Sequence, residues 1–167
     1  VVVCVLDATE GITEQDQHVL GFALEAGRAM VIAINKWDGL TDEQKKEVKD
    51  SLAWRFEFVK HVRVHFISAK HGTGVGNLYE SIHEAYDAAF RDISTSKLNK
   101  ALEEAMSVVQ PPLSRGRRIK PRYAHMGGHN PPLIIIHGNQ VDRLPESYQR
   151  YLIGHFRETF KLMGTPM

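Results

Sequence analysis

The stretch Met30-Val31-Ile32-Ala33-Ile34-Asn35-Lys36-Trp37-Asp38 decides the fold, because an apolar run stops there at a polar loop. The five residues Met30–Ile34 have strand length and show no alternation, which is typical of a strand buried on both faces of a sheet. Val1–Leu6 before this stretch and Val62–Ile67 after it are also predicted strands. The sequence therefore predicts three strands, of which the second ends at a polar loop.

Helix signals separate these strands. Thr13-Glu14-Gln15-Asp16 and Thr41-Asp42-Glu43-Gln44 each resemble a capping box, and the second opens a helix that we expect to reach about Val59. Asn77 is predicted to cap a third helix. A strand followed by a helix, three times over, predicts an α/β domain with a parallel sheet and right-handed crossovers.

The rhythm changes after about residue 92. The later elements follow the order helix, strand, strand, helix, which predicts a small α+β domain in which the two strands form a hairpin. They are expected at residues 96–109, Arg117–Ala124, Leu133–Ile136 and from Pro145 to about Met163.

Charge divides the chain at the same place. Residues 1–92 hold 10 Lys and Arg against 15 Asp and Glu, a net charge of −5, whereas residues 93–167 hold 11 against 5, a net charge of +6. We therefore predict two domains, residues 1–93 and residues 94–167. The basic second domain is expected to face an anionic partner.

Two polar motifs follow two of the predicted strands. Asn35-Lys36-Trp37-Asp38 comes directly after the second strand, and Ser68-Ala69-Lys70 after the third. Ligands of open parallel sheets bind beyond the carboxyl ends of the strands, so both motifs are expected at one edge of the sheet. Each motif alone is equally typical of a helix cap or a turn. Together and in this order they resemble the base-recognition motifs of translation-factor-class GTPases.

The residue types suit guanine. An ionised Asp38 can accept hydrogen bonds from the ring N–H and the exocyclic amine, a donor pair that adenine lacks. The backbone N–H of Ala69 can donate to the guanine carbonyl oxygen, and Asn35 is expected to link the two loops and reach a ring nitrogen. We expect Ser68 to orient the carboxylate. The stems of Lys36 and Lys70 can lie along the two faces of the base.

The resemblance extends along the whole chain and is closest to the Der (EngA) family. It implies a partial P-loop-GTPase parallel sheet with flanking helices, followed by a small α+β KH-like domain. It also implies a cytoplasmic protein that binds GTP and GDP, carries two tandem GTPase domains, and acts on ribosomal RNA in maturation of the large ribosomal subunit. The segments that carry it include Leu6-Asp7-Ala8, Asn35–Leu40, Gly72–Leu78, Gln110-Pro111-Pro112, Arg115–Arg118, Tyr123-Ala124-His125, Asn130-Pro131-Pro132 and His137–Gln140.

The elements that would hold the phosphates are not found in this sequence. No G-x-x-x-x-G-K-[ST] loop occurs, and the family's two switch segments and their Mg²⁺ ligands precede the position of Val1. We therefore predict no catalytic residue in this chain, very weak GTP binding, and no hydrolysis by the chain alone. The chain is expected to be part of a longer protein, in which further strands adjoin Val1–Leu6 and follow Met167.

Basic residues gather in the second domain between residues 115 and 122. Beside Tyr123 they suit contacts to RNA, although a solvated strand face is the simpler alternative. Strand alternation predicts Arg118, Lys120 and Arg122 on one face of the strand and Arg117 on the other. The Gly-x-x-Gly loop of KH domains is not evident, so this face is expected either to meet ribosomal RNA by shape or to contact the protein's own N-terminal GTPase domain. The residues are Arg115, Arg117, Arg118, Lys120 and Arg122.

The alternative interpretation of the whole chain is a non-catalytic module that binds RNA or the ribosome. Other classes find little support. No run of about 18 apolar residues occurs, so no membrane span is predicted. The nine histidines lack the spacing of metal ligands, and no metal site is predicted. Cys4 is expected to be a buried thiol in a reducing cytoplasm.

Overall fold

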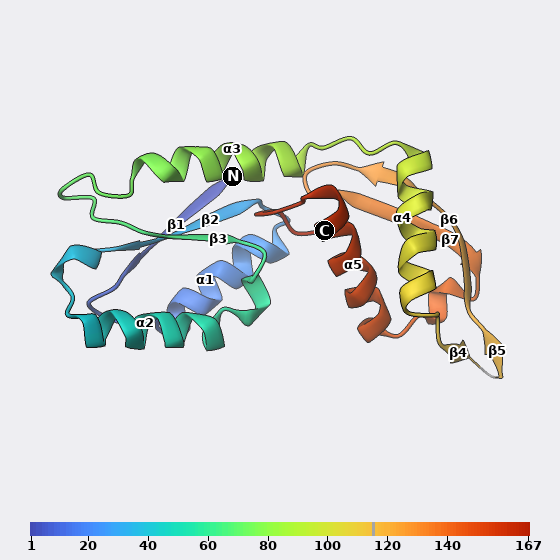
Figure 1. Cartoon of the computed structure of the whole chain (residues 1–167), viewed down its shortest axis with the longest axis horizontal. Coiled ribbons are helices and arrows are strands. Elements are labelled where there is room, and N and C mark those ends of the chain that lie inside the picture. Colours follow the sequence, from blue (N-terminus) through green and yellow to red (C-terminus); the bar gives the residue numbers. More distant parts are fainter. Residues whose placement is uncertain (115) are drawn as a thin grey trace. The chain divides into compact units, whose positions relative to one another are not determined.

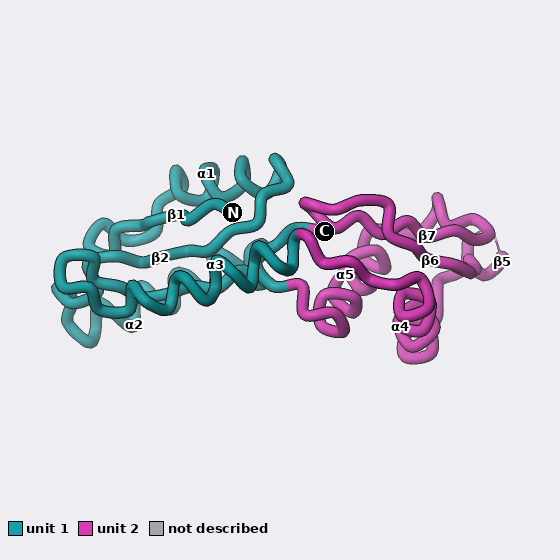
Figure 2. Tube along the Cα trace, turned by 90° about the horizontal axis from the view of Figure 1, so that it is seen from above, with its two compact units in different colours: residues 1–89, 163–166 teal, residues 90–162, 167 magenta. Residues whose placement is uncertain are grey.

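The computed structural model describes residues 1–114 and 116–167, which form two compact units. The first comprises Val1–Ala89 and Met163–Pro166, and the second comprises Phe90–Leu162 and Met167 (Figure 2). Arg115 lies outside the described residues.

A three-stranded parallel sheet organises the first unit (Figure 1). Its strands are β1 (Val2–Asp7), β2 (Met30–Asn35) and β3 (Arg63–Phe66), and β2 lies in the centre. Because β2 is covered on both faces, its residues from Met30 to Ile34 are all fully buried. The predicted α/β class is confirmed.

Helices cover both faces of this sheet (Figure 1). On one face α1 (Glu14–Glu25) and α2 (Asp42–Arg55) bury side chains against Cys4, Ile32 and Ile34. On the other face α3 (Gly76–Ala89) packs against Val31 and Ala33. Burial raises the pKa of the Cys4 thiol, as expected of an inert buried cysteine.

Two of the three helix starts predicted for the first unit are confirmed. Thr13 and Thr41 both make the predicted capping boxes, with Asp16 and Gln44 as the reciprocal partners. Two expectations were wrong. The second helix does not continue to Val59, because α2 ends at Arg55 and a separate 3₁₀ turn follows at Glu57–Val59. Asn77 is not a cap, because α3 already begins at Gly76.

The end of the chain returns to the first unit. Gly164 accepts a hydrogen bond from the Met30 amide at 2.7 Å and donates its own N–H to the carbonyl oxygen of His61 at 2.8 Å. Thr165 beside it is fully buried. A positive φ of 73° at Gly164, and the 2.6 Å that would separate its added Cβ from Ala85, show why glycine occupies this position.

The second unit is an α+β arrangement built on an antiparallel hairpin (Figure 1). Helix α4 (Thr95–Val108) packs against β6 (Lys120–Gly128) and α5 (Glu146–Phe160). The Asn99 side chain on α4 binds both backbone groups of Ala124 on β6, at 2.9 and 3.1 Å. Among the described residues, no helix combines the length and apolar character that crossing a membrane needs. The elements are α4 (Thr95–Val108), β4 (Leu113–Ser114), β5 (Arg117–Arg118), β6 (Lys120–Gly128), β7 (Leu133–Asn139) and α5 (Glu146–Phe160).

The strand expected at Arg117–Ala124 is interrupted. Its first two residues pair with β4 in a separate small sheet, and Ile119 is 1% exposed. The following strand has an irregular register between Pro121 and Tyr123, so the simple alternation predicted for the basic residues is wrong. A buried apolar residue and a bulge therefore replace one continuous strand.

The hairpin supplies a test of its packing. A Cβ at position 138 would lie 2.1 Å from the backbone oxygen of Lys120, whereas a Cβ at position 128 would have its nearest neighbour, Leu133 Cβ, at 3.9 Å. We expect Gly138→Ala to destabilise the hairpin by about 2 kcal/mol or more. The added Cβ would clash with the Lys120 backbone, which cannot move aside as a flexible side chain can. Gly128→Ala is the matched control. Hydrogen exchange of the β6 and β7 amides measures both, and equal protection in the two variants would contradict this strand register.

Candidate functional site

The carboxyl ends of the three parallel strands form the candidate site. Asp7 at the end of β1 pairs in register with Asn35 at the end of β2, and the Ala8 amide donates to the Asn35 carbonyl at 3.0 Å. The loop after β3 joins them through two hydrogen bonds. The Trp37 N–H donates to the Ile67 carbonyl at 3.1 Å, and the Ala69 N–H donates to Asn35 Oδ1 at 2.9 Å.

Asp38 occupies a 3₁₀ turn, Trp37–Gly39, directly after β2. A hydrogen bond from the buried Ser68 hydroxyl is the largest cause that lowers the pKa of its carboxyl group, and the charges of His71 and Lys70 add to the effect. His71 Nε2 lies 3.3 Å from the Asp38 Oδ2 atom. The carboxylate is therefore ionised at neutral pH, partly exposed, and a strong acceptor.

Lys36 turns toward β1. Its φ of 63° places it in the left-handed region, and its ammonium lies 2.5 Å from Asp7 Oδ2. Thr9 holds the other carboxylate oxygen of Asp7 with its amide at 2.9 Å and its hydroxyl at 2.7 Å. The hydrogen bonds from Lys36 and then from Thr9 lower the pKa of Asp7 to about 2, and Asp7 raises the pKa of Lys36.

Apolar contacts support the loops from behind. The rings of Trp37 and Phe66 have centroids 4.2 Å apart, and Lys49 Nζ lies 5.8 Å from the Trp37 centroid. The loop after β3 folds back on itself, since the Ser68 amide donates to the Thr73 carbonyl at 3.0 Å. These contacts fix both polar loops on the rigid edge of the sheet.

Both predicted motifs open onto one cavity of about 330 Å³. The structure thus brings the predicted residues together, and all of them except Ala69 line the cavity. Ala69 is engaged instead with the Asn35 oxygen. The lining residues are Thr9, Asn35, Lys36, Asp38, Gly39, Ser68 and Lys70.

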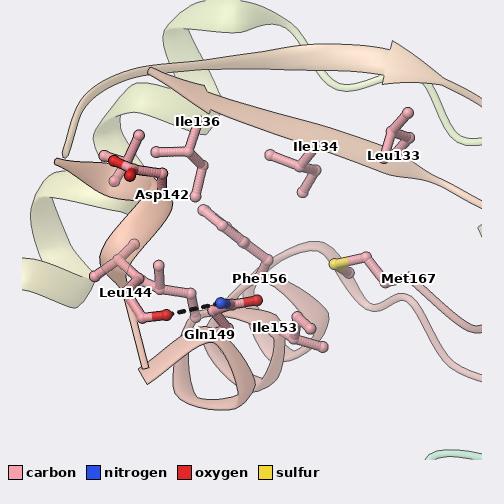
Figure 3. A pocket seen from close by; sticks show the side chains of 11 residues that line it. Leu133, Ile134, Ile136, Asp142, Leu144, Gln149, Ile153, Phe156 and Met167 are labelled. Atoms are coloured by element: carbon pink, nitrogen blue, oxygen red, sulfur yellow. Dashed lines mark hydrogen bonds between the residues drawn. The ribbon is translucent and has the colours of Figure 1, made fainter. Parts of the chain in front are cut away.

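A larger cavity of about 500 Å³ lies in the second unit, between β7 and α5 (Figure 3). Aliphatic side chains such as Ile134 and Ile136 dominate its wall, and the Gln149 amide already donates to the Leu144 carbonyl at 2.8 Å. It offers few groups that could orient a polar ligand. The smaller cavity is therefore the better candidate, because its chemistry is richer.

Sequence reasoning missed three polar residues of the site: Asp7, Thr9 and His71. Asp7 had a signal, since it directly follows the predicted strand Val1–Leu6, whose carboxyl end must lie at the same edge. Thr9 and His71 had none, because side-chain direction in a loop does not follow from sequence spacing. Among the described residues, no group of three or more His, Cys, Asp or Glu side chains is placed to hold a metal ion.

The basic residues of the second unit are spread over two small sheets. Arg117 and Arg118 form β5, and the Arg118 guanidinium donates to the Gln110 side chain and, at 3.4 Å, to the Pro111 carbonyl. Lys120 and Arg122 lie in β6, and both are exposed. The predicted contact residue Arg115 lies outside the described residues.

The Asp7 ion pair is directly testable. Lys36→Met should raise the pKa of Asp7 from about 2 toward its ordinary value of 3.8, because the ammonium hydrogen bond is the largest cause of the shift. Since the folded-state pKa is depressed, the pair stabilises the fold above the unfolded-state pKa, and this stabilisation is lost as pH falls through about 2.

Carboxyl-carbon NMR titration measures this pKa. Lys45→Met is the control, because Lys45 lies 3.9 Å from a different carboxylate, Asp42. A wild-type midpoint for Asp7 near 3.8 would contradict the ion pair.

Comparisons with known proteins agree with this geometry. Residues 1–88 match the elongation factor Tu GTP binding domain, and residues 92–167 match the family described as KH-domain-like of EngA bacterial GTPase enzymes, C-terminal. The chain is 60% identical over 167 residues to GTPase Der of Psychrobacter sp. (strain PRwf-1) and to GTPase Der of Hahella chejuensis. It is 56% identical to GTPase Der of Klebsiella pneumoniae.

Each of these matches covers 100% of the chain, which spans 35% of the length of the first two relatives and 34% of the third. The two family models together match nearly the whole chain, and the alignments with the relatives extend over all of its 167 residues. The chain therefore belongs to the Der (EngA) family of GTPases and corresponds to its C-terminal region.

Proposed function

We propose that the first unit recognises the guanine base of GTP and GDP, and that Asp38 reads the base. The observation that supports this most directly is the ionised, partly exposed Asp38 carboxylate, which Ser68 holds at the mouth of a cavity. Two donors of guanine, the ring N–H and the exocyclic amine, would meet its two oxygens. Adenine would leave the carboxylate unpaired, which is costly.

The remaining residues would complete the base site. Lys36 and Lys70 line the cavity, and their stems would cover the two faces of the ring. With Asn35 Oδ1 accepting from Ala69, the Asn35 Nδ2 group is the donor that would meet a ring nitrogen. The Ala69 N–H would then be shared between Asn35 and the guanine carbonyl oxygen.

Hydrolysis of GTP would belong to the longer protein. This sequence contains no G-x-x-x-x-G-K-[ST] loop, and the described residues hold no carboxylate cluster that would suit Mg²⁺. We propose that a phosphate loop, the switches and Mg²⁺ act through other parts of the protein. The chain alone would bind GTP very weakly and would not hydrolyse it.

The second domain, residues 94–167, would contact ribosomal RNA of the large ribosomal subunit, in the cytoplasm. The exposed Arg117, Lys120 and Arg122 support this proposal through charge. Contact of the same surface with the protein's N-terminal GTPase domain is the competing role. A purely RNA-binding, non-catalytic module is the alternative function, and the same basic residues favour it.

Asp38→Asn tests the base-reading role. In the complete protein, the change should weaken GTP binding by about 10- to 100-fold, because a charged acceptor is removed. It should at the same time improve binding of xanthosine triphosphate, whose carbonyl replaces the exocyclic amine. Asp50→Asn on α2 is the matched control, since Asp50 is exposed and does not line the cavity. Equilibrium binding of GTP and of xanthosine triphosphate measures the effect. If Asp38→Asn leaves the preference for GTP over xanthosine triphosphate unchanged, Asp38 does not read the base.

Charge reversal tests the second domain. Arg117→Glu with Lys120→Glu should weaken co-sedimentation of the complete protein with large ribosomal subunits. The slope of log affinity against log salt concentration should fall by about 1 for each phosphate that the protein no longer neutralises. Lys97→Glu with Lys100→Glu on α4 makes the same charge change elsewhere in the unit. If both double variants behave alike, the basic face is not the RNA contact.

A further inference from the structure

A β-bulge gives the hairpin two distinct faces. Pro121 pairs with Gly138 and Tyr123 with His137, so Arg122 is the extra residue on β6. On either side of this bulge Pro121 and Ala124 are buried, whereas Arg122 and Tyr123 are both exposed. The bulge therefore places two consecutive side chains on the outward side of the hairpin.

Three rings gather on this outward face, and two of them are stacked, whereas the plane of Tyr123 is tilted by 33° from His125 and by 38° from His137. The centroids of His125 and His137 are 5.1 Å apart and their planes differ by 6°, which is a parallel stack. Tyr123 joins them, with its centroid 5.6 Å from His125 and 6.0 Å from His137. Tyr123 is 44% exposed, and His137 is exposed as well. We name Tyr123, His125 and His137 the ring platform.

The His125 ring lies parallel to His137 and beside Tyr123. Its Nδ1 atom is buried and has no hydrogen-bond partner among the described residues. Its neighbours in ring contacts are Tyr123 and His137. The platform is thus built for contact through ring faces.

The platform lies between a basic end and an apolar end. Lys120 and Arg122 are exposed at one end of β6. At the other end Leu133 is 53% exposed and Ile135 is 37% exposed, and a Cβ at Gly127 would lie 2.5 Å from Ile135 Cδ1. Neither β6 nor β7 contains an Asp or Glu, and the Asp92 carboxylate lies 3.8 Å from His129 in the turn between them.

We propose that this outward face binds single-stranded RNA, with unpaired bases stacked on the ring platform and phosphates beside Lys120 and Arg122. Exposed rings next to cations, with no acidic residue among them, complement a chain of flat bases and phosphates. Bases inside a duplex are already stacked and present no free face, so unpaired nucleotides are the ligand. The proposal rests on the RNA-binding role given above, which was argued from positive charge alone. It adds to that role the residues that stack on bases and the class of RNA that is bound.

The platform also accounts for single-strand binding without a Gly-x-x-Gly loop. KH domains that clamp single strands use that loop on the nucleotide backbone. Here the hairpin turn contains Gly127-Gly128 side by side, without the required spacing. Stacking on an open sheet face needs no such loop, and therefore single-strand binding does not depend on it.

Binding of a labelled oligonucleotide of about 12 nucleotides tests the proposal, with the full chain as the protein and the same sequence as a duplex for comparison. We expect tighter binding of the single strand. Tyr123→Ala should weaken it by about 10-fold with an unchanged salt dependence, because the cations that face the phosphates stay in place. Tyr123→Phe should restore binding, since the ring face returns. A fluorescent 2-aminopurine base in the strand should be quenched by wild type and less by Tyr123→Ala.

Tyr79→Ala is the matched control, because Tyr79 is 64% exposed on α3 of the first unit. Equal effects of Tyr79→Ala and Tyr123→Ala would overturn the proposal, as would equal affinity for single strand and duplex. Loss of ribosome association in Tyr123→Ala without loss of RNA binding would assign the face to a protein partner instead. If the Arg117 and Lys120 reversal weakens ribosome binding while Tyr123→Ala changes nothing, only the stacking proposal fails. If neither has an effect, the RNA-binding role fails with it.

Discussion

The hydrogen bond from the Ala69 amide to Asn35 Oδ1 is the constraint on which the candidate site depends. It joins the loop after β2 to the loop after β3, whose strands are already in parallel register. Once the two loops are joined, Ser68 reaches the Asp38 carboxylate and holds it ionised. The Asn35 side chain thus adds to the backbone bond from Trp37 to Ile67, and together the two bonds hold the loops that line the cavity.

Electrostatics divides the site into two parts. At one side Asp7, at the end of β1, neutralises Lys36 and is itself held by Thr9. At the other side Asp38 keeps an accessible negative charge beside Lys70 and His71. An uncharged base with two adjacent donors fits such a surface better than an anion does. This division of charge supports the proposed role of the site in binding the base part of a nucleotide.

The fold and most of the candidate site were predictable from the sequence, because they depend on short stretches of neighbouring residues. Runs such as Met30–Ile34 fix buried strands, and parallel strands bring Asn35 and Ser68 to one edge whatever the helices do. Features that depend on three-dimensional packing were not predictable. The direction of Lys36 follows from its left-handed backbone, and the burial of Ile119 and the bulge at Arg122 follow from packing and pairing within the second unit.

The return of Met163–Pro166 to the first unit has a consequence for how the gene can be divided. A single cut near residue 89 would separate the central strand from the segment that accepts its first amide hydrogen, and it would leave the surface of Ala85 beside Gly164 open to water. Neither unit can therefore be exchanged between proteins by replacing one continuous piece of the chain that starts or ends at residue 89. Recombination that exchanged one of them intact would need two crossovers, because the first unit is discontinuous along the chain.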